Sequence, residues 1–187
     1  MYLFIYKYTM NPYKSVIENV TRIYEWNDRV DTLRVNKSIQ PFDLTSGLKI
    51  LNEERDELHK AQVEHNEIEE ADALADIFVV CVWELRKLWL SLIEVQNIFD
   101  AQWEIDLNWF RHAVIKTLGV NNVFVVSLCD AIRDLDRYFP KQKDHILTEV
   151  IDKLFTRFGT WCYVNESNKF IKSSDYIKPD LWFVQHK

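Results

Sequence analysis

Apolar residues recur along most of this chain with the period of about 3.6 residues that marks an amphipathic α-helix, so the pattern predicts an all-α protein. One clear stripe consists of Leu44, Leu48, Leu51 and Leu58. The run from Ile77 to Trp83 is apolar almost all round, which is typical of a helix enclosed by other helices. The expected helices cover residues 12–28, 44–65, 67–92, 97–118, 122–139 and 143–165. Residues 123–126 alone would also suit a strand.

Several residues that start or stop helices stand at the boundaries of these segments. Asp43 or Thr45 is a suitable N-cap for a helix that ends near His65. Gly119 suits the position that follows a helix, and Pro140 stops the segment before it. The chain has only three Gly and four Pro in 187 residues. This scarcity favours long helices joined by few tight turns.

Composition and charge narrow the class of protein further. With 187 residues and 48% hydrophobic residues, the chain suits one globular domain, residues 1–187, with a sizeable core. A net charge of −6 argues against a nucleic-acid partner, and the apolar runs are too short for a membrane span. The chain has an odd number of cysteines, and all of them stand in apolar surroundings: Cys81, Cys129 and Cys162. This is expected for buried thiols in the reducing cytoplasm. Residues 1–10 are a short strand or an upstream extension, and both interpretations stay open.

The most informative stretch carries two pairs of acids on consecutive expected helices. Glu54 and Glu57 are spaced i, i+3, and Asp72 and Asp76 are spaced i, i+4, so each pair lies on one helix face. Asp76 shares its face with apolar residues, where an unpaired carboxylate costs several kcal/mol. A divalent cation such as Mg²⁺ would offset this cost, because it takes oxygen ligands from facing helices. For either pair alone a solvated face is the simpler interpretation, but the two together favour a metal site.

These acids resemble the signature of the MazG-like all-α NTP pyrophosphohydrolases, in which an ExxE helix is followed by an ExxD helix. The first acid pair matches the first half of this signature. The second half departs from it, because Ala73 stands where the family has a Glu three residues before Asp76. Either Asp72 or the Glu69-x-x-Asp72 unit would then supply the missing ligand.

The resemblance implies the fold, the reaction and the residues that carry it. The implied fold is a MazG-like helical bundle, and the implied reaction is the hydrolysis of a nucleoside triphosphate to the monophosphate and pyrophosphate. The implied metal is Mg²⁺, with Mn²⁺ as a substitute, bound by Glu54, Glu57, Asp72 and Asp76. Glu53 would be the base that orients or deprotonates the attacking water.

Part of the substrate site is implied near the N-terminus. Trp26 and Asn27 match an aromatic–Asn pair that helps to form the nucleobase pocket in this family. A purely structural place for Trp26 in the core is an equally good interpretation of the same residue.

The C-terminal tail, residues 166–187, carries a second resemblance. Asn168 and Lys169, and then Tyr176 before a Lys-Pro-Asp-Leu segment, resemble phage-type members in which the Asn and Lys approach the nucleotide. The spacing is compressed here, so Lys172 is the alternative to Lys169 as the residue that stabilises charge on the phosphates. A solvated basic tail is the simpler alternative.

The resemblance covers residues 16–92 and 143–182, and the interval between them is longer than in phage-type members. Residues 97–139 are therefore expected to be an inserted pair of helices. The chain has no Gly-rich phosphate loop, no Gly-x-Ser-x-Gly elbow and no Cys-x-x-Cys pair. The histidines show no metal-ligand spacing.

The expected protein is therefore a Mg²⁺-dependent pyrophosphohydrolase of a (deoxy)nucleoside triphosphate, active in control of the nucleotide pool and in keeping with a phage-encoded enzyme. A homodimer or higher homo-oligomer is expected, because a small bundle leaves one side of its core open. The alternatives are a phosphoribosyl-ATP pyrophosphohydrolase and a helical protein that binds nucleotide or metal without turnover. The sequence leaves the base and the sugar of the substrate open.

Overall fold

The computed structural model describes residues 14–33, 43–88, 91, 123–158, 162–164 and 170–185. The helices in this part are α1 (Lys14–Thr32), α2 (Leu44–Glu64), α3 (Glu67–Lys87), α6 (Val123–Tyr138) and α7 (Lys143–Phe155). A short antiparallel pair, β1 (Tyr163–Val164) and β2 (Phe170–Ile171), and the 3₁₀ helix η1 (Trp182–Gln185) complete it. The expected all-α class is thus confirmed for the described residues, and none of their helices is long and apolar enough to cross a membrane.

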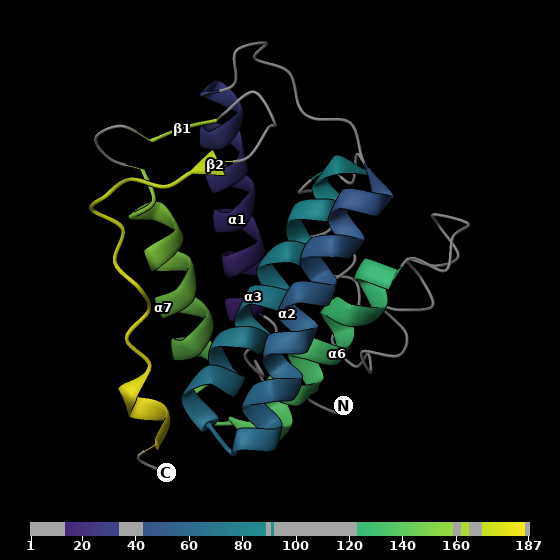
Figure 1. Ribbon diagram of the computed structural model, residues 1–187, viewed down its shortest axis with the longest axis vertical. Coiled ribbons are helices and arrows are strands. Elements are labelled where there is room, and N and C mark those ends of the chain that lie inside the picture. The colour runs from purple at the N-terminus through teal and green to yellow at the C-terminus, as the bar shows by residue number, and fades with distance from the viewer. Residues whose placement is uncertain are drawn as a thin grey trace, which may run out of the picture.

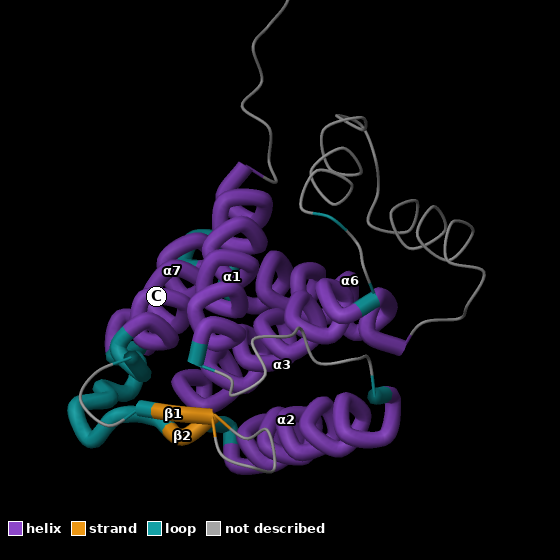
Figure 2. The backbone as a smooth tube through the Cα atoms, turned by 90° about the horizontal axis from the view of Figure 1, so that it is seen from above, coloured by secondary structure: helices purple, strands orange, loops and turns teal. Residues whose placement is uncertain are grey.

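Helix α3 is the centre of the fold. It packs against α1, α2, α6, α7 and η1, and Figure 2 shows it between the α1–α7 pair, α6 and α2. Residues 73–75 and 77–82 are all buried, so nearly every face of this part of the helix meets another element. This enclosure is the reason for the continuous apolar run that the sequence shows between Ile77 and Val82.

Two polar caps hold the α2–α3 hairpin, which is visible in Figure 1. The Asp43 carboxylate accepts a hydrogen bond of 3.0 Å from the Thr45 backbone N–H, so Asp43 is the N-cap of α2. His65 ends α2 with a positive φ of 52°, and the Asn66 side chain then caps α3 by accepting from the Glu69 N–H. The sharp reversal at His65 and Asn66 places α2 and α3 antiparallel.

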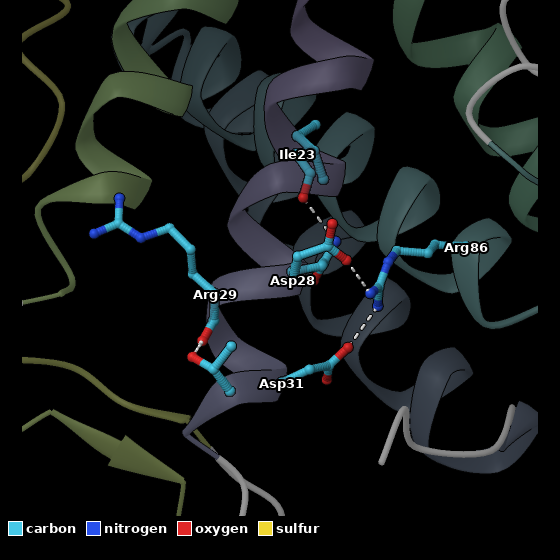
Figure 3. Close-up of polar contacts among 7 residues, drawn as sticks. Ile23, Asp28, Arg29, Asp31 and Arg86 are labelled. Atoms are coloured by element: carbon cyan, nitrogen blue, oxygen red, sulfur yellow. Dashed lines mark hydrogen bonds and ion pairs between the residues drawn. The ribbon is translucent and has the colours of Figure 1, made fainter. Parts of the chain in front are cut away.

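The end of α1 is fixed by ion pairs with α3, as Figure 3 shows. The Arg86 guanidinium donates to the Asp31 carboxylate at 2.8 Å and also to the Asp28 carboxylate. The side chains of Arg86 and Asp31 are only 9% and 14% exposed. Because Val30 is buried as well, α1 continues to Thr32 instead of ending near Asp28 as the sequence pattern predicted.

Two other predicted helix ends are wrong. Helix α3 ends at Lys87 and not beyond residue 92, and α7 ends at Phe155 and not near residue 165. At the second of these ends the Thr156 hydroxyl donates to the Lys153 carbonyl at 2.8 Å. Tyr163 then pairs with Ile171 in the β1–β2 ladder, so the chain has already left the helix.

The inserted pair of helices expected at residues 97–139 falls partly outside the described residues, which resume at residue 123. The described half is α6, which is a helix and not a strand. It packs directly on α3, and Phe124, Leu128, Ile132 and Leu135 are among the fully buried side chains. This segment therefore contributes to the main core.

The segment that follows β2 is held against α7, along which it runs in Figure 1. The Ser173 N–H donates to the Arg157 carbonyl at 3.0 Å, and the Ile177 N–H donates to the Thr156 hydroxyl at 3.3 Å. Leu181 is buried at its far end, just before η1. These contacts fix the tail as part of the fold.

All three cysteines are free thiols. Cys81 and Cys129 are buried as expected, whereas Cys162 is only partly buried, so the expectation of a buried thiol is wrong there. Burial raises the pKa of the Cys81 thiol far above its usual value.

Candidate functional site

The acids that the sequence singled out come close together between α2 and α3. We call Glu54, Glu57, Asp72 and Asp76 the carboxylate cluster. Burial, with the charges of Asp72 and Glu54 adding to it, raises the pKa of Asp76 to about 8. Burial and then the charge of Glu57 raise the pKa of Glu54 to about 7. The acids of the two helices are therefore within electrostatic reach of one another.

The pKa of Asp72 supports the same arrangement. Burial, followed by the charge of Glu69, raises the pKa of Asp72 to about 6, and Glu57 adds to the rise. The Oδ1 atom of Asp72 is buried and has no hydrogen-bond partner. Asp72 and Glu69 are the two candidates to replace the Glu that the family signature has at position 73. Both lie near the cluster, but Asp72 is partly buried and Glu69 is exposed.

Among the described residues, no hydrogen bond or ion pair ends on a carboxylate of the cluster. Elsewhere in the described fold, Asp31 binds Arg86, and one oxygen of Glu84 binds Lys87 at 2.7 Å. The other oxygen of Glu84, Oε2, is buried without a hydrogen-bond partner, as Asp72 Oδ1 is. An unpaired, partly buried carboxylate is destabilising, because it loses hydration without gaining a counter-charge. Glu57 is exposed, whereas Glu54, Asp72 and Asp76 are partly buried. Within the described residues, these three carboxylates are electrostatically unfavourable and have no direct counter-charge.

Two cations in the segment after α7 lie within electrostatic reach of the cluster. The positive charge of Arg157 opposes the upward shift of the pKa at Glu54, Asp72 and Asp76, and Lys178 does the same at Asp72. Arg157 follows α7 directly, and Lys178 lies in the tail that packs along α7. The site therefore has an acidic side, made by α2 and α3, and a basic side, made by the tail.

Neither cation was identified as a site residue from the sequence. The helix predicted for residues 143–165 placed Arg157 inside a helix, whereas it lies beyond the end of α7. One feature of the sequence could have identified Arg157: it is the only charged residue in the otherwise largely apolar run Leu154–Phe158. Lys178 belongs to the Lys-Pro-Asp-Leu segment, which was used only for its resemblance to phage-type members and was not considered as a source of positive charge.

The donor set suits a hard cation, but its geometry is not that of a finished coordination sphere. In the part of the chain that the structure describes, no group of three or more His, Cys, Asp or Glu side chains is arranged to hold a metal ion. The cluster offers only carboxylate oxygens, including the unpartnered Oδ1 of Asp72, and Mg²⁺ prefers such ligands together with water. The residues fit Mg²⁺ in ligand chemistry alone, because the described side chains do not converge on one ion.

Glu53, the predicted base, lies at the exposed edge of the cluster. Its carboxylate is 4.0 Å from the Lys49 ammonium, one turn earlier on α2. Its charge contributes to the raised pKa of Glu54. Glu53 is thus close to Glu54 and exposed to water.

Trp26 lies in the core, which was the alternative to a place in the nucleobase pocket. It is 2% exposed, and its Nε1–H donates to the Leu154 carbonyl at 2.9 Å. Its ring centroid lies 5.8, 5.9 and 5.6 Å from those of Trp83, Phe158 and Phe170. The polar edge and the faces of the ring are therefore already in contact with the protein.

Asn27 beside it is 1% exposed, and its amide donates to the Ile23 carbonyl at 2.9 Å. Its Oδ1 is buried without a hydrogen-bond partner. Asn27 therefore has an unused acceptor, whereas Trp26 has no unused donor.

Of the predicted tail residues, Asn168 and Lys169 lie outside the described residues. Tyr176 is half-buried and Lys172 is exposed. The Lys172 ammonium lies 4.2 Å from the centroid of the Tyr176 ring, and the Arg157 guanidinium lies 5.2 Å from the same centroid. Lys172 is thus placed on the basic side of the site.

No protein-family model, curated protein or solved structure was found to match this chain.

Proposed function

We propose that this protein hydrolyses a (deoxy)nucleoside triphosphate to the monophosphate and pyrophosphate, with Mg²⁺ at the carboxylate cluster, as a MazG-like enzyme. The observation that supports this proposal is the pair of opposed, unpaired charges: partly buried acids on α2 and α3 face Arg157 and Lys178 without contacting them. A metal ion bound to a phosphate chain is a ligand that complements both sides at once.

The residues of the chain divide the work of this reaction. The carboxylate cluster would hold Mg²⁺, which when bound polarises phosphate oxygens and lowers the pKa of the attacking water. Glu53 would orient that water or accept its proton from the exposed edge of α2. Lys172, or Lys169 outside the described residues, would stabilise negative charge on the phosphates.

A protein that binds nucleotide or metal without turnover is the second candidate. It is favoured by the finding that no acids of the described residues converge as a metal site. A phosphoribosyl-ATP pyrophosphohydrolase would use the same cluster and differ only in the base and sugar that it accepts. We further propose a cytoplasmic homodimer that acts in nucleotide-pool control.

A panel of the eight common NTPs and dNTPs, each with Mg²⁺, tests the reaction. We expect a monophosphate and intact pyrophosphate, with no diphosphate at early times. In ¹⁸O-labelled water the label should enter the monophosphate alone, because attack is expected at the α-phosphorus. Early diphosphate with free phosphate would replace this reaction with γ-phosphate hydrolysis, and binding without any product would support the second candidate.

A matched pair of variants on α2 tests the site. Glu54→Gln removes a carboxylate of the cluster while keeping its shape, and Glu64→Gln makes the same change at an exposed position near the end of the helix. We expect turnover to be lost in the first variant and kept in the second. Near-normal pyrophosphate release by folded Glu54→Gln would place the metal elsewhere.

A further inference from the structure

Arg157 has a side chain that the fold holds in place without using its hydrogen-bond donors. Its Nε is buried and has no hydrogen-bond partner, and no ion pair of the guanidinium is found among the described residues. By contrast, Arg86 of α3 and Arg133 of α6 each bind carboxylates. Within the described residues, Arg157 is therefore a cation without a hydrogen-bond or ion-pair partner, and it lies within electrostatic reach of acids that also lack partners there.

Its position is fixed by the backbone and by an aromatic ring. The Arg157 carbonyl accepts from the Ser173 N–H at 3.0 Å, which ties the end of α7 to the tail. The guanidinium carbon lies 5.2 Å from the centroid of the Tyr176 ring, and the Lys172 ammonium lies 4.2 Å from the same centroid. A cation held over an aromatic ring is attracted by the ring without using its hydrogen-bond donors.

The surroundings of this pair favour an anion as the missing partner. Two cations over one tyrosine ring repel each other, and a bound anion would relieve that repulsion. A guanidinium fork binds two oxygens of a phosphate at once, and such charge-assisted bonds are about twice as strong as neutral ones. Among the described residues no carboxylate contacts Arg157, so its guanidinium has no direct counter-charge there.

We propose that Arg157, steadied by Tyr176 and assisted by Lys172, forms a subsite that binds the phosphate chain, opposite the carboxylate cluster. The proposal rests on the proposed function for the identity of the substrate, but the subsite itself is tested with inorganic pyrophosphate. A purely structural Arg157 would serve as a distant counter-charge for the acids, and pyrophosphate binding would then not depend on it.

The test is a calorimetric titration of the full chain with pyrophosphate, in Mg²⁺ and separately in a chelator. Arg157→Ala should weaken binding about 10- to 100-fold, the loss expected for hydrogen bonds to a charged group. Arg133→Ala removes the same charge from the surface of α6 and should bind like the wild type. Unchanged binding by folded Arg157→Ala, or no binding by the wild type, would overturn the subsite.

If Arg157→Ala does not fold, Arg157→Lys decides instead. It keeps the charge but loses the planar fork, so we expect at least a roughly threefold loss of affinity, and wild-type affinity would overturn the proposal. Failure of the subsite and failure of the enzyme are distinguishable. If the wild type hydrolyses no nucleotide but binds pyrophosphate, and Arg157→Ala loses that binding, the subsite is supported and the proposed enzymatic activity is refuted. If the wild type hydrolyses dNTPs and Arg157→Ala has the same KM, the enzymatic activity is supported and the subsite is refuted.

Discussion

Replacing Asp76 with Asn should make the metal-free protein more stable, although Asp76 is a proposed metal ligand. Burial and neighbouring charges raise the pKa of Asp76 from its ordinary value of 3.8 to about 8. The folded state therefore binds a proton at this site more tightly than the unfolded state does. At neutral and alkaline pH the folded protein must either keep that proton or bury a charge, and both lower its free energy of unfolding. An amide of the same shape removes this cost.

The size and the pH dependence of the effect follow from the shift. It spans about four pKa units, and at about 1.4 kcal/mol per unit the upper limit is about 6 kcal/mol. Part of the shift comes from Asp72 and Glu54, and residual hydration reduces the rest, so we expect a gain of about 2 to 3 kcal/mol at pH 8. Because the folded-state pKa is raised, the gain should shrink as the pH falls and nearly vanish below about pH 4.

Thermal unfolding in a chelating buffer at several pH values measures this prediction. For a chain of this length the expected gain at pH 8 corresponds to a rise in Tm of about 5–10 °C. Asp56→Asn, at an exposed position on α2, is the matched control and should leave Tm nearly unchanged. Addition of Mg²⁺ should stabilise the wild type and not Asp76→Asn. A lower Tm for Asp76→Asn at pH 8, or an equal gain at pH 4 and pH 8, would refute the reasoning.

Four further variants test the packing and the ion pairs of the fold by chemical denaturation. Gly47→Ala should destabilise by about 1–3 kcal/mol despite the better helix propensity of Ala, because its Cβ would lie 2.8 Å from the buried Phe124 ring; a gain would show that the ring yields easily. Trp26→Phe should cost about 2 kcal/mol through the lost indole hydrogen bond and volume, and a neutral result would argue against its place in the core. Asp31→Asn should cost about 3 kcal/mol, whereas Asp28→Asn, with its side chain 70% exposed, should cost under about 1 kcal/mol; equal losses would contradict the difference in burial.

The order of the helices was predictable from the sequence because it depends on local information. Apolar periodicity and the Asp43 cap placed α2 correctly, and the acid pairs were placed on one face each by their spacing alone. The end of α3 was not predictable, because no Gly or Pro stands near it, whereas Gly159 follows the end of α7 by four residues and was a signal that the prediction missed. After α7, Tyr163 pairs with Ile171 instead of continuing a helix, and helical periodicity does not report such a pairing. Local sequence contains no record of those contacts.

The same limit explains why the candidate site was only half predicted. Its acidic side lies on helices, where spacing determines the direction of a side chain. Its basic side lies on irregular chain, where direction depends on packing, and Arg157 could not be separated from the other arginines. Trp26 shows the converse: its residue type suits a base pocket, but the bond from its indole N–H to the Leu154 carbonyl places it in the core.

The strongest argument that the carboxylate cluster is functional is the contrast with other charges of this fold. Where Arg86 meets Asp31 at low exposure, direct ion pairs form, so the fold has a means of pairing partly buried charges. Arg157 lies within electrostatic reach of Asp72 and Asp76, yet no such pair forms there. Stability alone would favour neutral side chains at these positions. Variants with neutral side chains at these positions should therefore unfold less readily and also lose pyrophosphate binding. If the acids served only the fold, the same variants would be less stable than the wild type and would bind pyrophosphate equally well.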